Sequence, residues 1–258
     1  MSIQAVIAGE TRYLGCLPRR HPPGVVYPVF GERGPARILP RSEWQPCDYS
    51  YFITRVLDQD GQGACNAFAS VQALHFLRAQ MGLPYVELSA GNLYGRINGG
   101  RDQGSLLSDS IRELEQRGVC RAELVPHLVW QPSRWPPGWE QDAQRFRVTE
   151  AWDCPTFEHI ASAIQLGFAV NIGILIGRNF DPGPDGWVPD RQGAAGGHAM
   201  CVVGLDRRGS TWGVRVVNSW GPNWGKNGFA IIPESYFRNT VWTDGWAVRV
   251  AVDPEGPE

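Results

Sequence analysis

The hydrophobic pattern of the chain changes near its middle, and this change constrains the fold more than any other feature. In the first part, apolar residues recur at helical spacing in CNAFASVQALHFLRAQMG, which predicts a helix over residues 65–82. Shorter helices are expected over 105–118 and 158–167, each closed by a glycine. After residue 167, the apolar runs FAVNIGILIG, HAMCVVGLD, TWGVRVVNSWG, GFAIIP and GWAVRVAV predict strands. This order predicts an α+β fold with two lobes and a cleft between them.

The first 45 or so residues have a different character. The stretch RRHPPGVVYPVFGERGPARILPRSEWQP is dense in proline, glycine and arginine, which favours extended, turn-rich chain over helix. We expect an N-terminal arm over residues 1–38 and one domain over residues 39–258. The simpler expectation is that the arm wraps the surface, and the alternative is that it covers the cleft.

Composition excludes several classes of function. The formal net charge of −2 argues against a nucleic-acid-binding protein, which would carry a basic excess. The sequence contains no apolar run of about 18 residues, so no membrane span is expected. The start MSIQAVIAGETRYLG lacks a basic stretch followed by an apolar one, so we expect no secretory signal and a cytoplasmic protein. The six cysteines lie far apart without a C-x-x-C pair, which predicts reduced, mostly buried thiols and neither a metal site nor a cofactor.

One cysteine stands at a chemically significant place. In DQDGQGACNAFA, Cys65 opens the first predicted helix. The helix dipole stabilises a thiolate at that end and lowers the pKa of the thiol. Cys65 is therefore either a buried packing residue at the start of a helix or a nucleophile. A nucleophile needs a base within hydrogen-bond reach.

The histidines supply one strong candidate for that base. His198 follows two glycines and begins an apolar strand, as a residue at the edge of a cleft would. A hairpin centred near Arg208 would place His198 opposite Asn218, whose amide could orient the imidazole. Trp220 could shield this contact from water. We expect the other four histidines to be surface or hydrogen-bonded residues: His21, His75, His127 and His159.

Gln59 lies six residues before Cys65, in the loop that leads to the helix. Its side-chain amide, together with the backbone N–H of Cys65, could donate hydrogen bonds to a developing oxyanion. The alternative is a solvated loop glutamine.

These residues and their motifs resemble the papain-like cysteine peptidases. The matching stretches are QDGQGACNAFA, GGHAMCVVGLD and NSWGPNWGKNGFAIIP, in the family's order of Cys, His and Asn. The resemblance implies a helical left lobe and a β-barrel-like right lobe with the cleft between them. It also implies that Cys65 is the nucleophile, held as a thiolate beside protonated His198. Asn218 would orient His198, Gln59 would complete the oxyanion hole, and Trp220 would cover the Asn218–His198 contact.

The chain departs from the usual family pattern at two positions. Asn66 stands where a tryptophan usually follows the nucleophile, and Gln62 stands where extracellular members carry a bridged cysteine, which suits a reducing compartment. The segment DQGSLLSDSIRELEQRGVC is closer to prokaryotic members of the family.

The resemblance also suggests where a substrate would lie. It puts the substrate backbone along Gly104 and Ser105, with Gly197 on the other wall. A rival placement uses the NGG glycines, Gly99 and Gly100. The family's inhibitory propeptide is longer and helical, so we expect the short arm to be mostly structural.

The predicted function is that of a cysteine endopeptidase acting on peptide or protein substrates through an acyl-enzyme. One alternative is an acyltransferase or ligase that passes the same acyl-enzyme to an amine. The other is an inert peptide-binding member of the fold.

Overall fold

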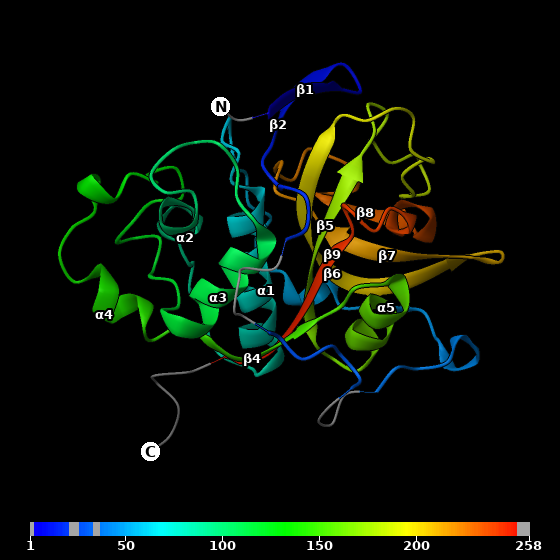
Figure 1. Ribbon diagram of the computed structural model, residues 1–258, viewed down its shortest axis with the longest axis horizontal. Helices are drawn as coiled ribbons and strands as arrows, with labels where there is room; N and C mark the ends of the chain where they lie inside the picture. Colours follow the sequence, from blue (N-terminus) through cyan, green and yellow to red (C-terminus); the bar gives the residue numbers. More distant parts are fainter. Residues whose placement is uncertain (1–2, 21–25, 33–36, 252–258) are drawn as a thin grey trace.

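The central helix α1 (Cys65–Gln80) separates the two halves of the molecule (Figure 1). The computed structural model describes residues 3–20, 26–32 and 37–251. Every residue of α1 from Cys65 to Arg78 is buried. Helices α2 (Ala90–Ile97) and α3 (Leu107–Gln116) pack on one side of it, and strands β5 (Ala169–Ile176) and β6 (Gly196–Arg208) pack on the other.

The second lobe is an antiparallel sheet of seven strands in the order β4-β9-β5-β6-β7-β8, with β3 paired to β6. The remaining strands of this sheet are β3 (Cys47–Asp48), β4 (Val148–Asp153), β7 (Thr211–Val217), β8 (Phe229–Pro233) and β9 (Asp244–Ala251). Helix α5 (Phe157–Gln165) packs against β5, β6 and β9. Over the described residues the sheet does not close into a barrel.

The predicted α+β class with a helical lobe and a strand-rich lobe is confirmed. The elements that were not predicted include β4, α2 and the hairpin of β1 (Ile3–Ile7) and β2 (Glu10–Leu14). The short helices are α4 (Trp139–Ala143), η1 (Arg41–Glu43), η2 (Ser50–Phe52), η3 (Pro132–Arg134) and η4 (Glu234–Arg238). Among the described residues no helix is long and apolar enough to cross a membrane.

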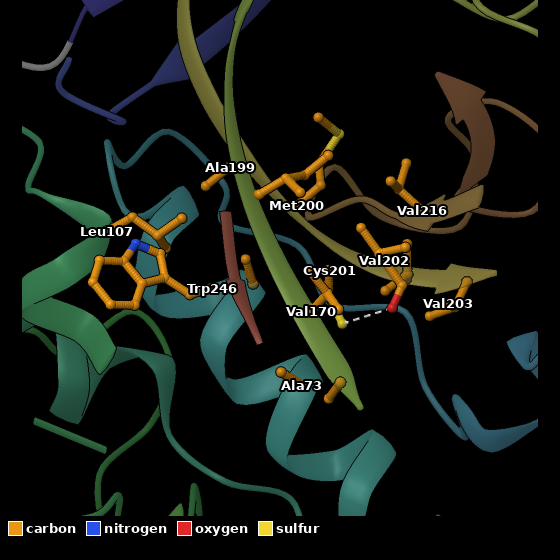
Figure 2. Close-up of a cluster of buried hydrophobic side chains, with 14 of the residues drawn as sticks. Ala73, Leu107, Val170, Ala199, Met200, Cys201, Val202, Val203, Val216 and Trp246 are labelled. Atoms are coloured by element: carbon orange, nitrogen blue, oxygen red, sulfur yellow. Dashed lines mark hydrogen bonds between the residues drawn. The ribbon is translucent and has the colours of Figure 1, made fainter. Parts of the chain in front are cut away.

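The core lies where α1 meets the sheet. Figure 2 shows Ala73 of α1 beside Val170 of β5 and Cys201 of β6, with Trp246 of β9 nearby, and all four are fully buried. Small side chains on the helix let the sheet approach closely, and the larger residues fill the remaining space. Cys201 packs in this core, as expected, which leaves His198 on the same strand free to serve the site.

The hairpin of β6 and β7 differs from the predicted register. Cys201 pairs with Val217 and Arg208 pairs with Thr211, with a bulge between Val202 and Gly204. The predicted pairing of residues 198 and 218 was therefore wrong by two positions. A shift of two keeps each side chain on its face of the sheet, so the residues on the functional face remain as predicted.

Candidate active site

The loop before α1 is held in place by the segment that follows β7. Asp58 forms an antiparallel β-bridge with Trp220, and the Gln59 N–H donates to the Ser219 carbonyl at 2.9 Å. Ala64 precedes the helix, and Cys65 is its first residue. These contacts bring the thiol loop and the NSW segment to one place, although 160 residues separate Gln59 from Ser219.

His198 and Asn218 form the pair that the sequence predicted. His198 Nε2 donates to Asn218 Oδ1 at 2.7 Å. The same oxygen accepts the Ser219 N–H at 2.8 Å, which fixes the orientation of the amide. The Trp220 ring stacks on the imidazole at a centroid distance of 4.5 Å and an angle of 27°. All three side chains are buried, so the hydrogen bond is shielded from water.

Cys65 lies beside the start of this pair. Burial raises the pKa of the Cys65 thiol, and the backbone of Ala199, the residue after His198, acts against this rise, so that backbone lies beside the thiol. With Nε2 bound to Asn218, Nδ1 is the nitrogen left for the thiol, and among the described residues it has no hydrogen-bond partner. The imidazole is therefore held in the tautomer whose Nδ1 can accept the thiol proton.

Gln59 is not a solvated loop residue, since it is 1% exposed. The Ser219 hydroxyl donates to Gln59 Oε1 at 2.6 Å, so the amide nitrogen of Gln59 points away from Ser219. Gln59 Nε2 donates to the carbonyl oxygens of Gln62 at 2.6 Å and Tyr13 at 3.0 Å. The Nε2 donor of Gln59 is therefore held beside the loop that precedes Cys65. The Tyr13 carbonyl of the N-terminal arm accepts one of its hydrogen bonds.

The arm does not only wrap the surface, because part of it covers Cys65. We call residues 13–20 the cleft segment. The Cys16 N–H donates to the Gly197 carbonyl at 3.2 Å, and the Leu17 N–H donates to the Ser105 carbonyl at 3.0 Å. The Ser105 N–H in turn donates to the Gly15 carbonyl at 2.8 Å. In Figure 1 this part of the chain (blue) descends from β2 between the helices and the sheet.

The cleft segment fits closely. A Cβ built on Gly15 would lie 1.8 Å from the Gly63 carbonyl oxygen, and one built on Gly197 would lie 2.1 Å from the Cys16 carbonyl oxygen. Only glycine permits this approach on either wall. The cleft segment pairs with the backbone groups that were predicted to hold a substrate, so this part of the arm covers the cleft, which was the alternative expectation.

The electrostatics of the covered site favour neutral groups. Burial raises the pKa of Cys65 to about 11, although backbone groups of Ala199, Gly15, Asn66 and Cys16 act in the opposite direction. Burial lowers the pKa of His198 to about 4, although the hydrogen bond that its Nε2–H donates to Asn218 Oδ1 acts in the opposite direction. Both shifts follow from the loss of water around the charged forms. With the cleft segment in place, burial therefore favours a thiol beside a neutral imidazole.

The structure places the two candidate segments for the substrate backbone differently. Gly104 and Ser105 lie against the cleft segment, and a Cβ on Gly104 would lie 2.5 Å from the Gly15 carbonyl oxygen. Gly99 and Gly100 are exposed and have open space around them.

The unusual Asn66 has a clear role beside this wall. Its Nδ2 donates to the Ser105 carbonyl at 2.6 Å and contacts the Ser105 hydroxyl at 3.0 Å. Asn66 thus joins the helix that carries Cys65 to the backbone that meets the cleft segment. Gln62 is the second position that departs from the usual family pattern, and its Nε2 donates to the Leu128 carbonyl at 3.1 Å.

Three of the remaining histidines are held away from the site. His75 accepts the Leu88 N–H at 3.0 Å, His127 accepts the Ala90 N–H at 3.2 Å, and His159 lies 2.8 Å from the Thr156 hydroxyl. His21 lies outside the described residues. Within the described part of the chain no cluster of His, Cys, Asp or Glu could hold a metal ion, and each of the six cysteines is free.

Sequence reasoning missed one charged group of the site. Arg19 of the cleft segment forms ion pairs with Asp153 at the end of β4 and with Asp244 at the start of β9. Both carboxylates are buried, at 5% and 2% exposure. The three residues come from distant parts of the chain, so no local pattern connects them.

Comparison with known proteins agrees with this arrangement. The model of the papain family cysteine proteases matches residues 40–240. An uncharacterised peptidase C1-like protein of Acanthamoeba polyphaga mimivirus is 26% identical over 226 residues, which span 77% of this chain and 70% of that protein. A cathepsin B-like protein of Giardia intestinalis is 27% identical over 199 residues, which span 70% of this chain and 65% of that protein.

Solved structures show the same fold. Xylellain, a cysteine protease from Xylella fastidiosa, superposes with a TM-score of 0.66 at 23% identity, covering 88% of this chain and 98% of its own. A procathepsin B from Trypanosoma congolense gives 0.67 at 15% identity, covering 85% and 83%. The fold and the match over most of the chain define a cysteine peptidase of the two-lobed α+β class. The chain belongs to the papain family of cysteine proteases.

Proposed function

We propose that residues 39–258 form the catalytic domain of a peptidase whose nucleophile is Cys65 and whose base is His198. The observation that carries the proposal is the pair of fixed side chains around the thiol. His198 is oriented by Asn218 at 2.7 Å, and Gln59 is oriented by Ser219 at 2.6 Å. A nucleophile, an oriented base and an oriented oxyanion donor are the groups that acyl transfer needs.

The reaction begins once the cleft segment leaves. Water then reaches the pair, so burial no longer opposes charge on either group. Nδ1 of His198 takes the thiol proton, and the Cys65 sulfur attacks the carbonyl carbon of a peptide bond. Gln59 Nε2 and the Cys65 N–H donate to the oxyanion. His198 returns the proton to the leaving amine, and water attacks the acyl-enzyme to release the acid.

Gly104, Ser105 and Gly197 are proposed to bind the substrate backbone. The support for this role is that the cleft segment uses the same groups, since Ser105 exchanges two hydrogen bonds with it and Gly197 accepts one. A bound peptide can replace these contacts one for one. Trp220 is proposed to keep the His198–Asn218 bond dry, which its stacking on the ring supports.

The test is covalent labelling followed by intact mass. The wild type, Cys65→Ala and His198→Ala are treated with an epoxide that carries a peptide-like backbone, each also in a Gly15→Ala background that displaces the cleft segment. A single adduct on the wild-type site, absent from Cys65→Ala and much slower in His198→Ala, is the expected result. Labelling of another cysteine, or labelling that is unaffected by His198→Ala, contradicts the proposed roles.

Acyl transfer to an amine is the second candidate, because it uses the same acyl-enzyme. It is separated from hydrolysis by the products. A peptide substrate is incubated with and without added amines, and the products are measured by mass spectrometry. We expect the free acid to dominate at millimolar amine. A dominant amide product would assign the chain to the acyltransferases.

A further inference from the structure

Two thiols lie in the covered cleft, and the proposed mechanism uses only one of them. Cys16 is 2% exposed and Cys65 is 0% exposed, and both are free. The backbone of Cys16 is fixed on both sides, because its N–H donates to the Gly197 carbonyl at 3.2 Å and it forms a β-bridge with Ser105. The cleft segment therefore holds a second cysteine at a defined place, and the mechanism gives it no role.

The two sulfur atoms lie against one residue pair of the sheet. A Cβ built on Gly173 of β5 would lie 2.7 Å from Cys16 Sγ. Gly173 pairs in register with Ala199 of β6, and the backbone of Ala199 lies beside the Cys65 thiol. The Cα atoms of paired residues on antiparallel strands are about 4.5–5.5 Å apart. Both thiols are thus close to the same short stretch of β5 and β6.

The backbone of the cleft segment also contacts the Cys65 thiol. Backbone groups of Gly15 and Cys16 act against the rise that burial causes in the pKa of Cys65, so they lie beside its thiol. Burial raises the pKa of Cys16 as well, and a charge on Cys65 raises it further. The two thiols are therefore neighbours, and part of the backbone that contacts the Cys65 sulfur belongs to the residue that carries the second thiol.

The other four cysteines lie elsewhere in the fold. Cys201 packs in the core between α1 and the sheet, and Cys47 belongs to β3. Cys120 is part of a separate small apolar cluster, and Cys154 follows the end of β4. All six cysteines are among the described residues, and of the other five Cys16 is the one that shares the cleft with the nucleophile.

We propose that Cys16 is a modification site, which forms a disulfide with Cys65 after the nucleophile has been oxidised by hydrogen peroxide. The covered thiol is protected, because burial keeps it protonated and the thiolate is the form that peroxide oxidises. Oxidation therefore takes place while the cleft segment is out of the cleft. When the segment returns, Cys16 is the thiol that meets the oxidised sulfur.

Two steps form the bond. In the first, the Cys65 thiolate attacks one peroxide oxygen, so that an S–O bond forms and the O–O bond breaks. Cys65 becomes a sulfenic acid, and the hydroxide that leaves takes up a proton to give water. In the second, the Cys16 sulfur attacks the Cys65 sulfur, the S–O bond breaks, and the hydroxyl group leaves as a second water with the thiol proton of Cys16. The two thiols lose two electrons in total, and one peroxide molecule accepts them.

The bond requires a turn of the Cys16 side chain, since Sγ faces Gly173 in the reduced protein. The disulfide then ties the cleft segment to the nucleophile, so the site stays closed until a thiol reductant cleaves the bond. It also stops the oxidation of Cys65 at a reversible stage, before the irreversible sulfinic acid forms. The same segment that covers the reduced site would thus preserve the oxidised one.

The first test maps the oxidised cysteines. The wild-type protein, reduced and then freed of reductant, is treated with a small excess of hydrogen peroxide and examined by intact mass and by peptide mapping without reduction. We expect the loss of two hydrogen atoms and one crosslinked pair of peptides, which contain Cys16 and Cys65. Dithiothreitol should reverse both changes. In Cys16→Ser the crosslink should be absent, and Cys65 should gain two oxygen atoms as a sulfinic acid.

Cys47→Ser is the matched control, because it removes a partly exposed thiol outside the cleft, and it should keep the crosslink. Cys16→Ala repeats the test with an apolar replacement, so a folding defect of one variant does not decide the result. A wild type in which Cys65 becomes a sulfinic acid while Cys16 stays reduced would overturn the proposal. A disulfide between other cysteines, or no oxidation of Cys65 in either the wild type or Gly15→Ala, would overturn it as well.

The second test measures how much reactive Cys65 survives oxidation. Wild type and Cys16→Ser are treated with peroxide, then with dithiothreitol, and Cys65 is labelled with the epoxide probe. The wild type should recover at least about fivefold more labelling, since thiols reduce a disulfide but not a sulfinic acid. Equal recovery would mean that Cys16 does not protect the nucleophile, and the proposal would be wrong. The crosslink is read without a substrate, so labelling of Cys65 without a crosslink would leave the proposed peptidase function intact.

Discussion

The side-chain amide of Gln59 donates a hydrogen bond to the backbone carbonyl of Tyr13 at 3.0 Å. The donor assigned to the oxyanion is therefore occupied by a carbonyl of the chain itself. Its geometry does not depend on this contact, because Ser219 fixes the other end of the amide. The donor is thus positioned before any substrate arrives.

Gln59→Ala should lower kcat by about 100-fold with little change in KM, because a donor that acts on the developing oxyanion contributes mainly in the transition state. The measurement is steady-state hydrolysis of a peptide substrate by the Gly15→Ala protein with and without the second change. Gln62→Ala on the same loop is the control and should stay within about twofold of its parent. A loss in KM alone would assign Gln59 to substrate binding.

Gly15→Ala should expose the site without deleting any chain. The new methyl group would meet the Gly63 carbonyl oxygen at 1.8 Å, so the cleft segment cannot remain seated. We expect alkylation of Cys65 by iodoacetamide at neutral pH to become at least about tenfold faster, since exposure lowers the thiol pKa towards its ordinary value. Peptide mapping identifies the alkylated residue.

Gly183→Ala is the control for that change. Its Cβ would meet the nearest atom at 3.4 Å, an ordinary contact, and its alkylation rate should match the wild type. An unchanged rate in Gly15→Ala would mean that the segment does not limit access to Cys65.

The stability of the wild type should depend on pH through His198. Its pKa is about 4 in the folded protein, where burial opposes the charge, and 6.5 is its ordinary value. Between these values the unfolded chain binds a proton that the folded chain does not. The contribution of His198 to the free energy of unfolding is therefore fully present above pH 6.5 and is lost as the pH falls towards 4. Below pH 4 it changes no further.

The corresponding measurement is urea unfolding of the wild type and His198→Gln from pH 7 to pH 4. The difference between the two curves isolates His198, because Asp244 and the other titrating groups are common to both. We expect the wild type to lose about 3 kcal/mol more than the variant over this range. Parallel curves would show that folding does not lower the pKa of His198.

Asn66→Ala should weaken substrate binding more than it slows chemistry. The change removes the donor to the Ser105 carbonyl at 2.6 Å, which steadies the backbone proposed to pair with a substrate. We expect KM to rise several-fold, kcat to stay within about twofold, and unfolding free energy to fall by about 1–2 kcal/mol. Ser70→Ala, also buried in α1, should affect stability only. A fall in kcat at constant KM would contradict this role.

The parts of the site that sequence predicts are those with short-range signals. Hydrophobic periodicity located α1, α3, α5 and the strands β5, β6, β7, β8 and β9 of the second lobe, because each pattern lies within one element. His198 and Asn218 could be paired because they belong to one hairpin. The pairing held even though the register was wrong by two positions, since side chains alternate along a strand with a period of two.

The parts that sequence did not predict depend on long-range contacts. The abundance of proline and glycine indicated an extended arm but not its path, which is decided by close contacts at Gly15 and Gly197. Arg19 meets partners that lie 134 and 225 residues away. The β1–β2 hairpin did carry one signal, the glycine at position 9, since Ala8 and Gly9 have positive φ angles of 50° and 87° that suit a tight turn.

The β1–β2 hairpin forms a sheet of its own, separate from the seven-stranded sheet. The five register pairs of β1 and β2 can therefore open without breaking the strand pairing of the sheet from β4 to β8. We therefore expect the hairpin to open as a local unit at a lower free energy than the seven-stranded sheet. In hydrogen exchange, the amides of β1, β2 and residues 16–19 should exchange through a local opening. Those of β5 and β6 should exchange only when the whole protein unfolds.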